Sequence, residues 1–173
     1  RSTVVVARHN FWGRTIAAVS SSSDPSARRG FGPYAPGFVE VPYDDVGALE
    51  AALDGPGGEG VVAFMVEPVQ GEVGAKRATA TALPRRRLES RFLARSPPSR
   101  DSQAGVVVPS DGYLARAAAA CAARRVLLVA DEVQTGLGRC GRRLASDHDG
   151  VRPDVVILGK ALSGGMLPVS AVL

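Results

Sequence analysis

Amines and thiols are scarce in this sequence of 173 residues. Of its 21 basic side chains, only Lys76 and Lys160 are lysines. The two cysteines, Cys121 and Cys140, are too few for a disulfide framework and lack the spacing of a metal site. With only two histidines, the chain offers no convincing Ser–His–Asp arrangement, and His148 stands among acidic residues in what we interpret as a solvated turn.

The sequence also lacks any apolar run long enough to span a bilayer. It has no initiator methionine, signal peptide or transit peptide at its start, and it stops inside the apolar run of residues 169–173. We therefore expect a fragment cut at both ends, with no membrane partner. The expected location is intracellular, in the mitochondrial matrix or the cytoplasm.

Positive charge is concentrated in residues 73–103, which hold eight basic and two acidic side chains in a chain of net charge +4. Because the excess lies in one segment, we do not expect nucleic-acid binding. The segment has no sustained apolar period, so it is predicted to be an atypical basic insertion, disordered at the surface. Valine codons begin with GT and glutamine can be CAG, so the segment could also be a retained intron. Its excision would join Glu72 to Ala104.

Elsewhere, strand and helix patterns alternate. Buried strands are predicted at residues 3–7, 61–66, 126–130 and 154–158, with shorter ones at 38–41 and 169–173. Helices are predicted at 14–20, at 45–53 and from 110 or 111 to about 125, and residues 24–37 are predicted to be a loop. This order predicts an α/β domain with right-handed crossovers and a parallel or mixed sheet.

Lys160 and Asp131 each stand at the carboxyl end of a predicted strand, where ligands gather in α/β sheets. A lysine amine can form an imine, which arginine cannot. An aspartate can keep a pyridinium nitrogen protonated, so that the ring acts as an electron sink. The simpler alternatives are a surface lysine and a helix-capping aspartate.

A nucleotide-binding interpretation uses the same residues, because Asp131 ends a Walker B-like strand and Gly159 precedes Lys160. The phosphate-loop pattern requires glycine at position 154 and serine or threonine after the lysine. The sequence has Asp154 and Ala161 there, and the two motifs occur in reversed order. This interpretation is therefore disfavoured.

Aromatic and acidic side chains follow two other predicted strands. Phe11 and Trp12 could stack on a planar ring, and Arg14 could grip a carboxylate, although core packing would explain the aromatics as well. Glu67 and Glu72 follow the strand at 61–66.

Five runs of sequence together resemble the class III pyridoxal-phosphate aminotransferases. They are residues 10–15 (NFWGRT), 30–33 (GFGP), 64–72 (FMVEPVQGE), 130–136 (ADEVQTG) and 158–165 (LGKALSGG). Within this class the first run, and the GEAGVVVP junction that excision of 73–103 would create, are most similar to ornithine aminotransferases. The resemblance implies the central part of the large cofactor-binding domain of a fold-type I enzyme, with a mostly parallel sheet and flanking helices.

The resemblance also implies a role for each candidate residue. Lys160 would form the Schiff base with pyridoxal phosphate and shuttle a proton, and Asp131 would pair with the pyridinium nitrogen. Phe11 would stack on the ring and Gln134 would bind its phenolic oxygen. The substrate contacts are assigned to Trp12, Arg14 and Glu72.

The implied activity moves the terminal amino group of ornithine to a 2-oxo acid, in a homodimer. Two alternatives stay open: another class III type, acting on acetylornithine or 4-aminobutyrate, and an inactive fragment. His9 departs from the family pattern, which has a small residue there, so the turn before Phe11 is expected to be altered.

Overall fold

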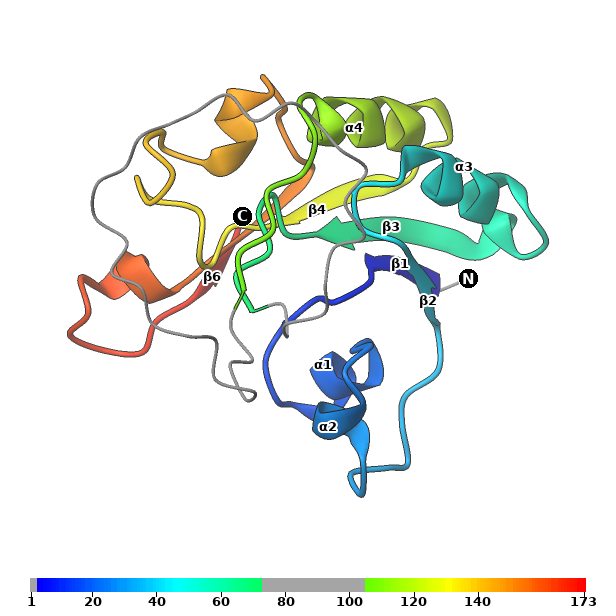
Figure 1. Cartoon of the computed structure of the whole chain (residues 1–173), viewed down its shortest axis with the longest axis horizontal. Coiled ribbons are helices and arrows are strands. Elements are labelled where there is room, and N and C mark those ends of the chain that lie inside the picture. The colour runs from blue at the N-terminus through cyan, green and yellow to red at the C-terminus, as the bar shows by residue number, and fades with distance from the viewer. Residues whose placement is uncertain (1–2, 73–104) are drawn as a thin grey trace, which may run out of the picture.

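The computed structural model of the chain describes residues 3–72 and 105–173 (Figure 1). The predicted insertion at 73–103 therefore lies outside the described residues. The elements run in the order β1 (Thr3–Ala7), α1 (Ile16–Ser20), α2 (Pro25–Arg28), β2 (Phe38–Val41), α3 (Val46–Asp54), η1 (Gly58–Gly60), β3 (Val61–Val66), α4 (Tyr113–Ala123), β4 (Leu127–Asp131), η2 (Ala145–His148), β5 (Val155–Leu158), η3 (Lys160–Ser163) and β6 (Ala171–Val172).

A single sheet organises the described part of the chain, with strand order β2-β1-β3-β4-β5-β6. Each neighbouring pair from β2 to β5 is parallel, and only β6 joins antiparallel, at the edge beside β5. The predicted α/β class with a mostly parallel sheet is confirmed. The apolar, β-branched composition of the inner strands suits strands that are covered on both faces.

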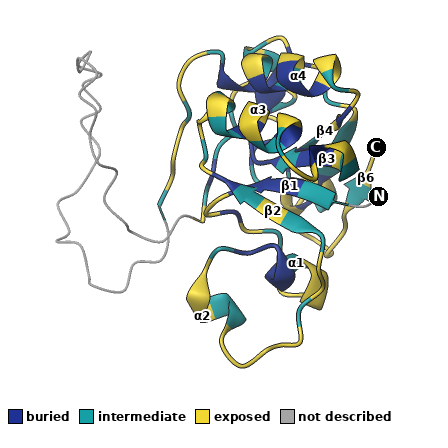
Figure 2. Cartoon of the chain, turned by 90° about the vertical axis from the view of Figure 1, so that its right-hand side faces the viewer, coloured by how far each residue is buried: buried dark blue, intermediate teal, exposed yellow. Residues whose placement is uncertain are grey.

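The main core lies between the sheet and the helices α3 and α4, which run side by side over one face (Figure 2). Val5, Phe64, Val66 and Leu128 project from the strands into this core, and Leu49 meets them from α3. Short helices α1 and α2 lie on the other side of the sheet. Among the described residues, no helix is long and apolar enough to cross a membrane.

The strands at 3–7, 38–41 and 61–66 have the predicted bounds, whereas several other boundaries differ. The strand predicted at 126–130 is shifted by one residue, so Asp131 is its last residue rather than the one after it. The predicted loop 24–37 contains the helix α2, because Asp24 caps it by accepting from the Ser26 N–H and Pro25 occupies its first position. Helix α4 begins only at Tyr113, after Gly112 in the left-handed region.

Candidate active site

Four parallel strands bring their carboxyl ends to one edge of the sheet. β1 leads into the loop that carries Phe11 and Trp12, and β3 into the turn that begins with Glu67. β4 ends on Asp131, and β5 is followed by Gly159 and then Lys160. Segments distant in sequence thus converge where ligands bind in sheets of this kind.

One cavity of about 170 Å³ joins these strand ends. The predicted residues Phe11, Trp12, Asp131, Gln134 and Lys160 all line it. Its other lining residues are Gly13, Glu67, Val69 and Val133. A second cavity, of about 370 Å³, shares the wall formed by residues 11–13 and also contains the predicted substrate residues Arg14 and Glu72. All seven predicted site residues therefore line one or both of two adjoining cavities.

Lys160 is the first residue of η3 and has a φ of 42°, in the left-handed region that non-glycine residues seldom adopt. The preceding Gly159 leaves little space, since a Cβ there would lie 3.2 Å from Cγ1 of Val133. Such backbone strain is typical of positions that the surrounding structure holds for function.

Asp131 is 8 % exposed, and its Oδ1 accepts from the Val133 N–H at 2.9 Å. Burial raises the pKa of its carboxyl, while the Val133 N–H and the positive charge of Lys160 lower it and Glu132 raises it. A cationic partner in the cavity would favour the charged form. Neighbouring Glu132 is fully buried, but its role is structural. Its carboxylate accepts from the N–H groups of Ala145 (3.0 Å) and Ser146 (2.9 Å).

Phe11 and Trp12 form an aromatic wall of the site, and His9 precedes them in the loop. His9 has a φ of 63°, and its N–H donates to Ser23 Oγ at 2.7 Å. Glycine would adopt this left-handed conformation at lower cost. The expectation that the turn before Phe11 is altered stays a prediction. The guanidinium of Arg14 lies 5.7 Å from the centroid of the Phe11 ring. Trp12 Nε1 is buried and finds no partner among the described residues, so the wall holds an unused hydrogen-bond donor.

Gln134 lines the smaller cavity and Glu72 the larger one, and the two side chains meet: Gln134 Nε2 donates to Glu72 Oε1 at 3.2 Å. Gly71 packs directly against this pair: a Cβ at Gly71 would lie 2.5 Å from Gln134 Oε1. The Gln134 amide, predicted to contact a ring oxygen, is therefore held by Glu72, one of the predicted substrate residues.

Glu67 was not among the predicted site residues, yet it lines the same cavity as Asp131 and Lys160 and is only 5 % exposed. Burial raises its pKa to about 8, and the charges of Asp131 and Glu72 act in the same direction. N–H groups of Phe11 and Gly71 act in the opposite direction. Its place directly after β3 was visible in the sequence, but nothing there separated it from Glu72.

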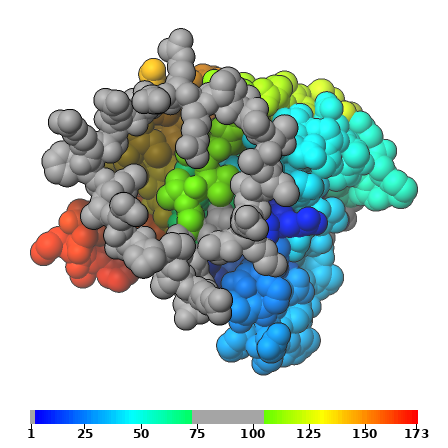
Figure 3. All heavy atoms as spheres, viewed as in Figure 1, coloured from blue at the N-terminus to red at the C-terminus, as the bar shows by residue number. Residues whose placement is uncertain are grey.

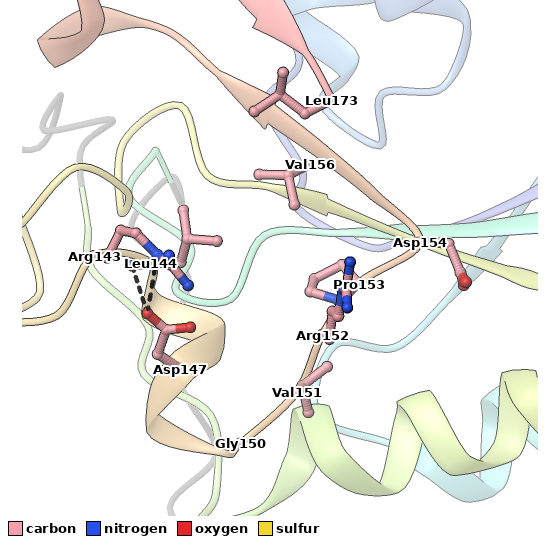
Figure 4. Close-up of a pocket in the computed structure, with 10 residues that line it drawn as sticks. All are labelled: Arg143, Leu144, Asp147, Gly150, Val151, Arg152, Pro153, Asp154, Val156 and Leu173. Atoms are coloured by element: carbon pink, nitrogen blue, oxygen red, sulfur yellow. Dashed lines mark hydrogen bonds and ion pairs between the residues drawn. The ribbon is translucent and has the colours of Figure 1, made fainter.

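A cavity larger than these two lies elsewhere, with a volume of about 850 Å³ (Figure 4). It is lined by residues of the segment 143–156 and by Leu173, and includes a long Arg143–Asp147 ion pair of 3.9 Å. It contains none of the predicted site residues. His148, at the end of η2 beside this region, is exposed, and its Nε2 lies 2.7 Å from the Cys140 carbonyl oxygen.

The model of the family "Aminotransferase class-III" matches residues 1–87 and 98–173. The chain belongs to this family. It is 50 % identical over its whole length to the mitochondrial ornithine aminotransferase of Drosophila melanogaster, and 42 % identical to the ornithine aminotransferase of Bordetella pertussis. It covers 32 % and 34 % of those proteins, so it spans about a third of the length of the curated relatives it matches.

Solved structures agree on the fold of this class-III aminotransferase chain. An ornithine aminotransferase structure from Toxoplasma gondii, described as having partial occupancy of PLP at its active site, superposes with a TM-score of 0.78 at 44 % identity. The match covers 99 % of this chain and 33 % of that one. An acetylornithine aminotransferase from Elizabethkingia anophelis gives 0.65 at 34 % identity, over 99 % and 30 % of the two chains. The expected cofactor-binding fold is confirmed.

Proposed function

We propose that this chain forms the central part of a pyridoxal-phosphate enzyme that moves the terminal amino group of ornithine to a 2-oxo acid, giving glutamate 5-semialdehyde and glutamate. The observation that carries the proposal is the convergence of Lys160, Asp131, Phe11 and Gln134 on one cavity. The curated relatives named above, at 42 % to 50 % identity, are ornithine aminotransferases, which favours ornithine over acetylornithine or 4-aminobutyrate.

The residues present fit the cofactor chemically. The cavity offers an amine, a buried carboxylate and an aromatic face, which match an aldehyde, a pyridinium nitrogen and a planar ring. When bound, pyridoxal phosphate supplies an electron-withdrawing ring that lets the substrate carbon bearing the amino group lose a proton.

Around that ring, each side chain has a defined task. Lys160 would hold the cofactor through its amine and afterwards carry the proton to and from the substrate carbon. Asp131 would keep the ring nitrogen protonated, and Phe11 would cover one face of the ring. Gln134, held by Glu72, would donate to the ring's phenolic oxygen.

The larger adjoining cavity would take the substrate. Arg14 would bind its carboxylate there, and Trp12 would line the passage between the two cavities. Glu72 bonds to Gln134 and lines the substrate cavity, so it could link substrate binding to cofactor position. The small molecules recognised would be an amino acid and a 2-oxo acid.

Lysine scarcity makes cofactor attachment easy to test. The chain is mixed with pyridoxal phosphate, reduced with borohydride and digested for mass spectrometry. The pyridoxyl group should appear on Lys160 and be lost in Lys160→Ala, while Lys76→Ala, the matched control at the only other lysine in the sequence, should retain it. Labelling of Lys76 instead, or of the N-terminal amine alone, would contradict the proposal.

Substrate choice is tested in a chimera, because the chain spans about a third of its relatives. Residues 1–173 replace the matching segment of the Drosophila melanogaster protein, with and without 73–103. We expect kcat/KM for ornithine to exceed that for acetylornithine and 4-aminobutyrate. A preference for acetylornithine or 4-aminobutyrate would assign the chain to a class-III type that acts on that substrate. Inactivity of both chimeras would favour the alternative of an inactive segment.

Residues 73–103 are proposed to be an insertion that the fold does not need. The family model leaves 88–97 unmatched, within this segment. Gln70 and Val107, on either side of it, are bonded to each other through N–H···O contacts of 3.0 and 2.8 Å. Transcript sequencing across Glu72–Ala104 tests the intron hypothesis, which fails if no shorter spliced product exists.

Assembly and location are proposed from the relatives. A homodimer is supported by exposed apolar side chains after Lys160, including Met166 and Leu167, in the segment that projects at one side of the molecule (Figure 3, red). Sedimentation of the chimera tests the homodimer, with a chimera in which Met166 and Leu167 are both replaced by serine as the comparison.

A mitochondrial location is supported by the names of the Drosophila melanogaster and Rattus norvegicus relatives, and cell fractionation tests this location.

A further inference from the structure

Glu67 connects two of the loops that form the site. It directly follows β3, and its Oε1 accepts from the main-chain N–H of Phe11 at 2.9 Å, across 56 residues of sequence. The N–H of Gly71 also acts on this carboxyl group and lowers its pKa. One buried side chain thus joins the aromatic wall after β1 to the turn that carries Glu72.

The main chain of Glu67 is fixed in turn by the helix-covered core. The hydroxyl of Tyr43 lies 3.1 Å from the carbonyl oxygen of Glu67 and 2.9 Å from that of Pro68. The Tyr43 ring packs edge-on against Tyr113 of α4, with centroids 5.4 Å apart. Tyr113 is buried and Tyr43 is partly buried against the same core, so the main chain of Glu67 is tied to this core while its carboxyl reaches outward to the loop.

A second contact runs in parallel. Gln70, 1 % exposed, donates from Nε2 to the carbonyl oxygen of Arg8 at 2.8 Å. Asn10 ties the same loop internally, to the carbonyl oxygens of Ala7 (2.8 Å) and Ser21 (3.0 Å). The part of the loop up to Asn10 is therefore held by several bonds, but Phe11 is held to the sheet edge by Glu67.

We propose that Glu67 is a positioning residue that sets where the Phe11–Trp12 wall stands over the cavity of Asp131 and Lys160. The inference rests on the proposed function, because it assigns that wall to the cofactor ring and the substrate passage. Glu67 acts through the Phe11 main chain, so it governs the fit of the cofactor rather than the proton transfer itself.

The length of the side chain is decisive. A glutamine keeps an oxygen at the same reach and can accept from the Phe11 N–H, whereas an aspartate is one methylene shorter and withdraws the acceptor beyond hydrogen-bond distance. A leucine fills the space but accepts nothing, which leaves a main-chain N–H without its partner. The wall should therefore be best ordered in the wild type and in Glu67→Gln, and less ordered in Glu67→Asp and Glu67→Leu.

Trp12 reports on the wall directly, because it is the only tryptophan in the chain. Its fluorescence and its quenching by acrylamide are measured on the 173-residue chain without cofactor. In Glu67→Asp and Glu67→Leu the quenching constant should rise at least about twofold, as the loop opens locally. In Glu67→Gln it should stay at the wild-type value.

Glu59→Leu and Glu59→Asp are the matched controls, since Glu59 is exposed in η1 at the opposite end of β3. They should leave Trp12 quenching unchanged. Circular dichroism identifies any variant that fails to fold. If Glu67→Leu does so, the comparison of Glu67→Asp with Glu67→Gln decides alone: equal quenching in these two overturns the proposal.

The dissociation constant of pyridoxal phosphate gives the second measurement. It should rise about tenfold in Glu67→Asp and Glu67→Leu, and less than about twofold in Glu67→Gln. If no variant and no wild-type chain binds the cofactor while Trp12 responds as expected, the proposed function fails and the positioning role stands. If the wild type binds and neither variant changes quenching or affinity, the positioning role fails.

Discussion

Replacing Glu67 with glutamine should change how the free energy of unfolding depends on pH. Burial, together with the facing charges of Asp131 from β4 and Glu72 from the next turn, raises the pKa of Glu67 from 4.5 to about 8. Between those values the folded chain keeps a proton on Glu67 that the unfolded chain has released. Linkage then makes the stability contribution of Glu67 complete below about pH 4.5 and progressively lost as the pH rises to 8.

The slope of the free energy of unfolding against pH determines how much stability Glu67 can contribute. Each pH unit inside the window lowers the free energy of unfolding by at most about 1.4 kcal/mol, so the ceiling between pH 5 and pH 8 is about 4 kcal/mol. Relaxation and water entry around a charged Glu67 reduce this, and we expect about 2 kcal/mol. Glu67→Gln carries no titrating group, so it should match the wild type near pH 5 and be more stable by that amount at pH 8.

Urea unfolding at pH 5, 6, 7 and 8 measures this difference for wild type and variant. Shared groups such as Asp24 and Asp54, whose pKa values are lowered, largely cancel in the difference. Glu59→Gln, at an exposed site, should run parallel to the wild type at every pH. If the stability difference between the wild type and Glu67→Gln stays constant from pH 5 to pH 8, the reasoning is refuted, because Glu67 then ionises as in the unfolded chain.

Three further changes have defined outcomes. Gly71→Ala places a Cβ 2.5 Å from Gln134 Oε1, so it should weaken pyridoxal phosphate binding about tenfold in a titration. Thr135→Val removes the hydroxyl that donates to buried Glu132, and should lower the free energy of unfolding in urea by about 1–3 kcal/mol. Deleting 73–103 leaves five residues between the paired Gln70 and Val107. Because the loop is shorter, the deletion should raise the free energy of unfolding by about 1–2 kcal/mol.

The two point substitutions each have a matched control. Gly47→Ala, where a Cβ meets only Asp45 at 3.5 Å, should leave cofactor affinity unchanged. Thr15→Val, at a helix start where the side chain makes no capping bond, should cost less than about 0.5 kcal/mol. Normal binding in Gly71→Ala, a neutral Thr135→Val, or a destabilised deletion chain would each contradict the contact from which it was derived.

Strands were the most predictable part of the fold, because their signal is local. The apolar runs at 3–7 and 61–66 end where the structure ends β1 and β3. Helix starts were less predictable, since they depend on single dihedral angles. Thr15 is extended, with ψ 160°, and this moves the start of α1 from the predicted residue 14 to Ile16. For α2 the Asp24-Pro25 capping signal was present but was outweighed by the surrounding glycines and prolines.

The site could be predicted as far as parallel strand ends determine it. Lys160 and Asp131 follow from that rule together with the scarcity of lysine. Glu67 could not be separated from Glu72 by position, because both follow the same strand. What distinguishes them is tertiary: Glu67 turns inward to the Phe11 N–H, whereas Glu72 is exposed and meets Gln134. No local pattern encodes a contact made across 56 residues.

The left-handed backbone conformations at two positions of the site could not be predicted from the sequence either. His9 and Lys160 have φ values of 63° and 42°, and each costs about 1 kcal/mol relative to glycine. At His9 only the main chain is used, through its N–H to Ser23, so His9→Gly should leave cofactor labelling intact and raise the free energy of unfolding by up to about 1 kcal/mol. Lys160→Gly should relieve the same strain and abolish labelling. If His9→Gly were instead to destabilise the chain while Lys160→Gly stabilised it, the His9 side chain, and not its backbone conformation, would determine the turn.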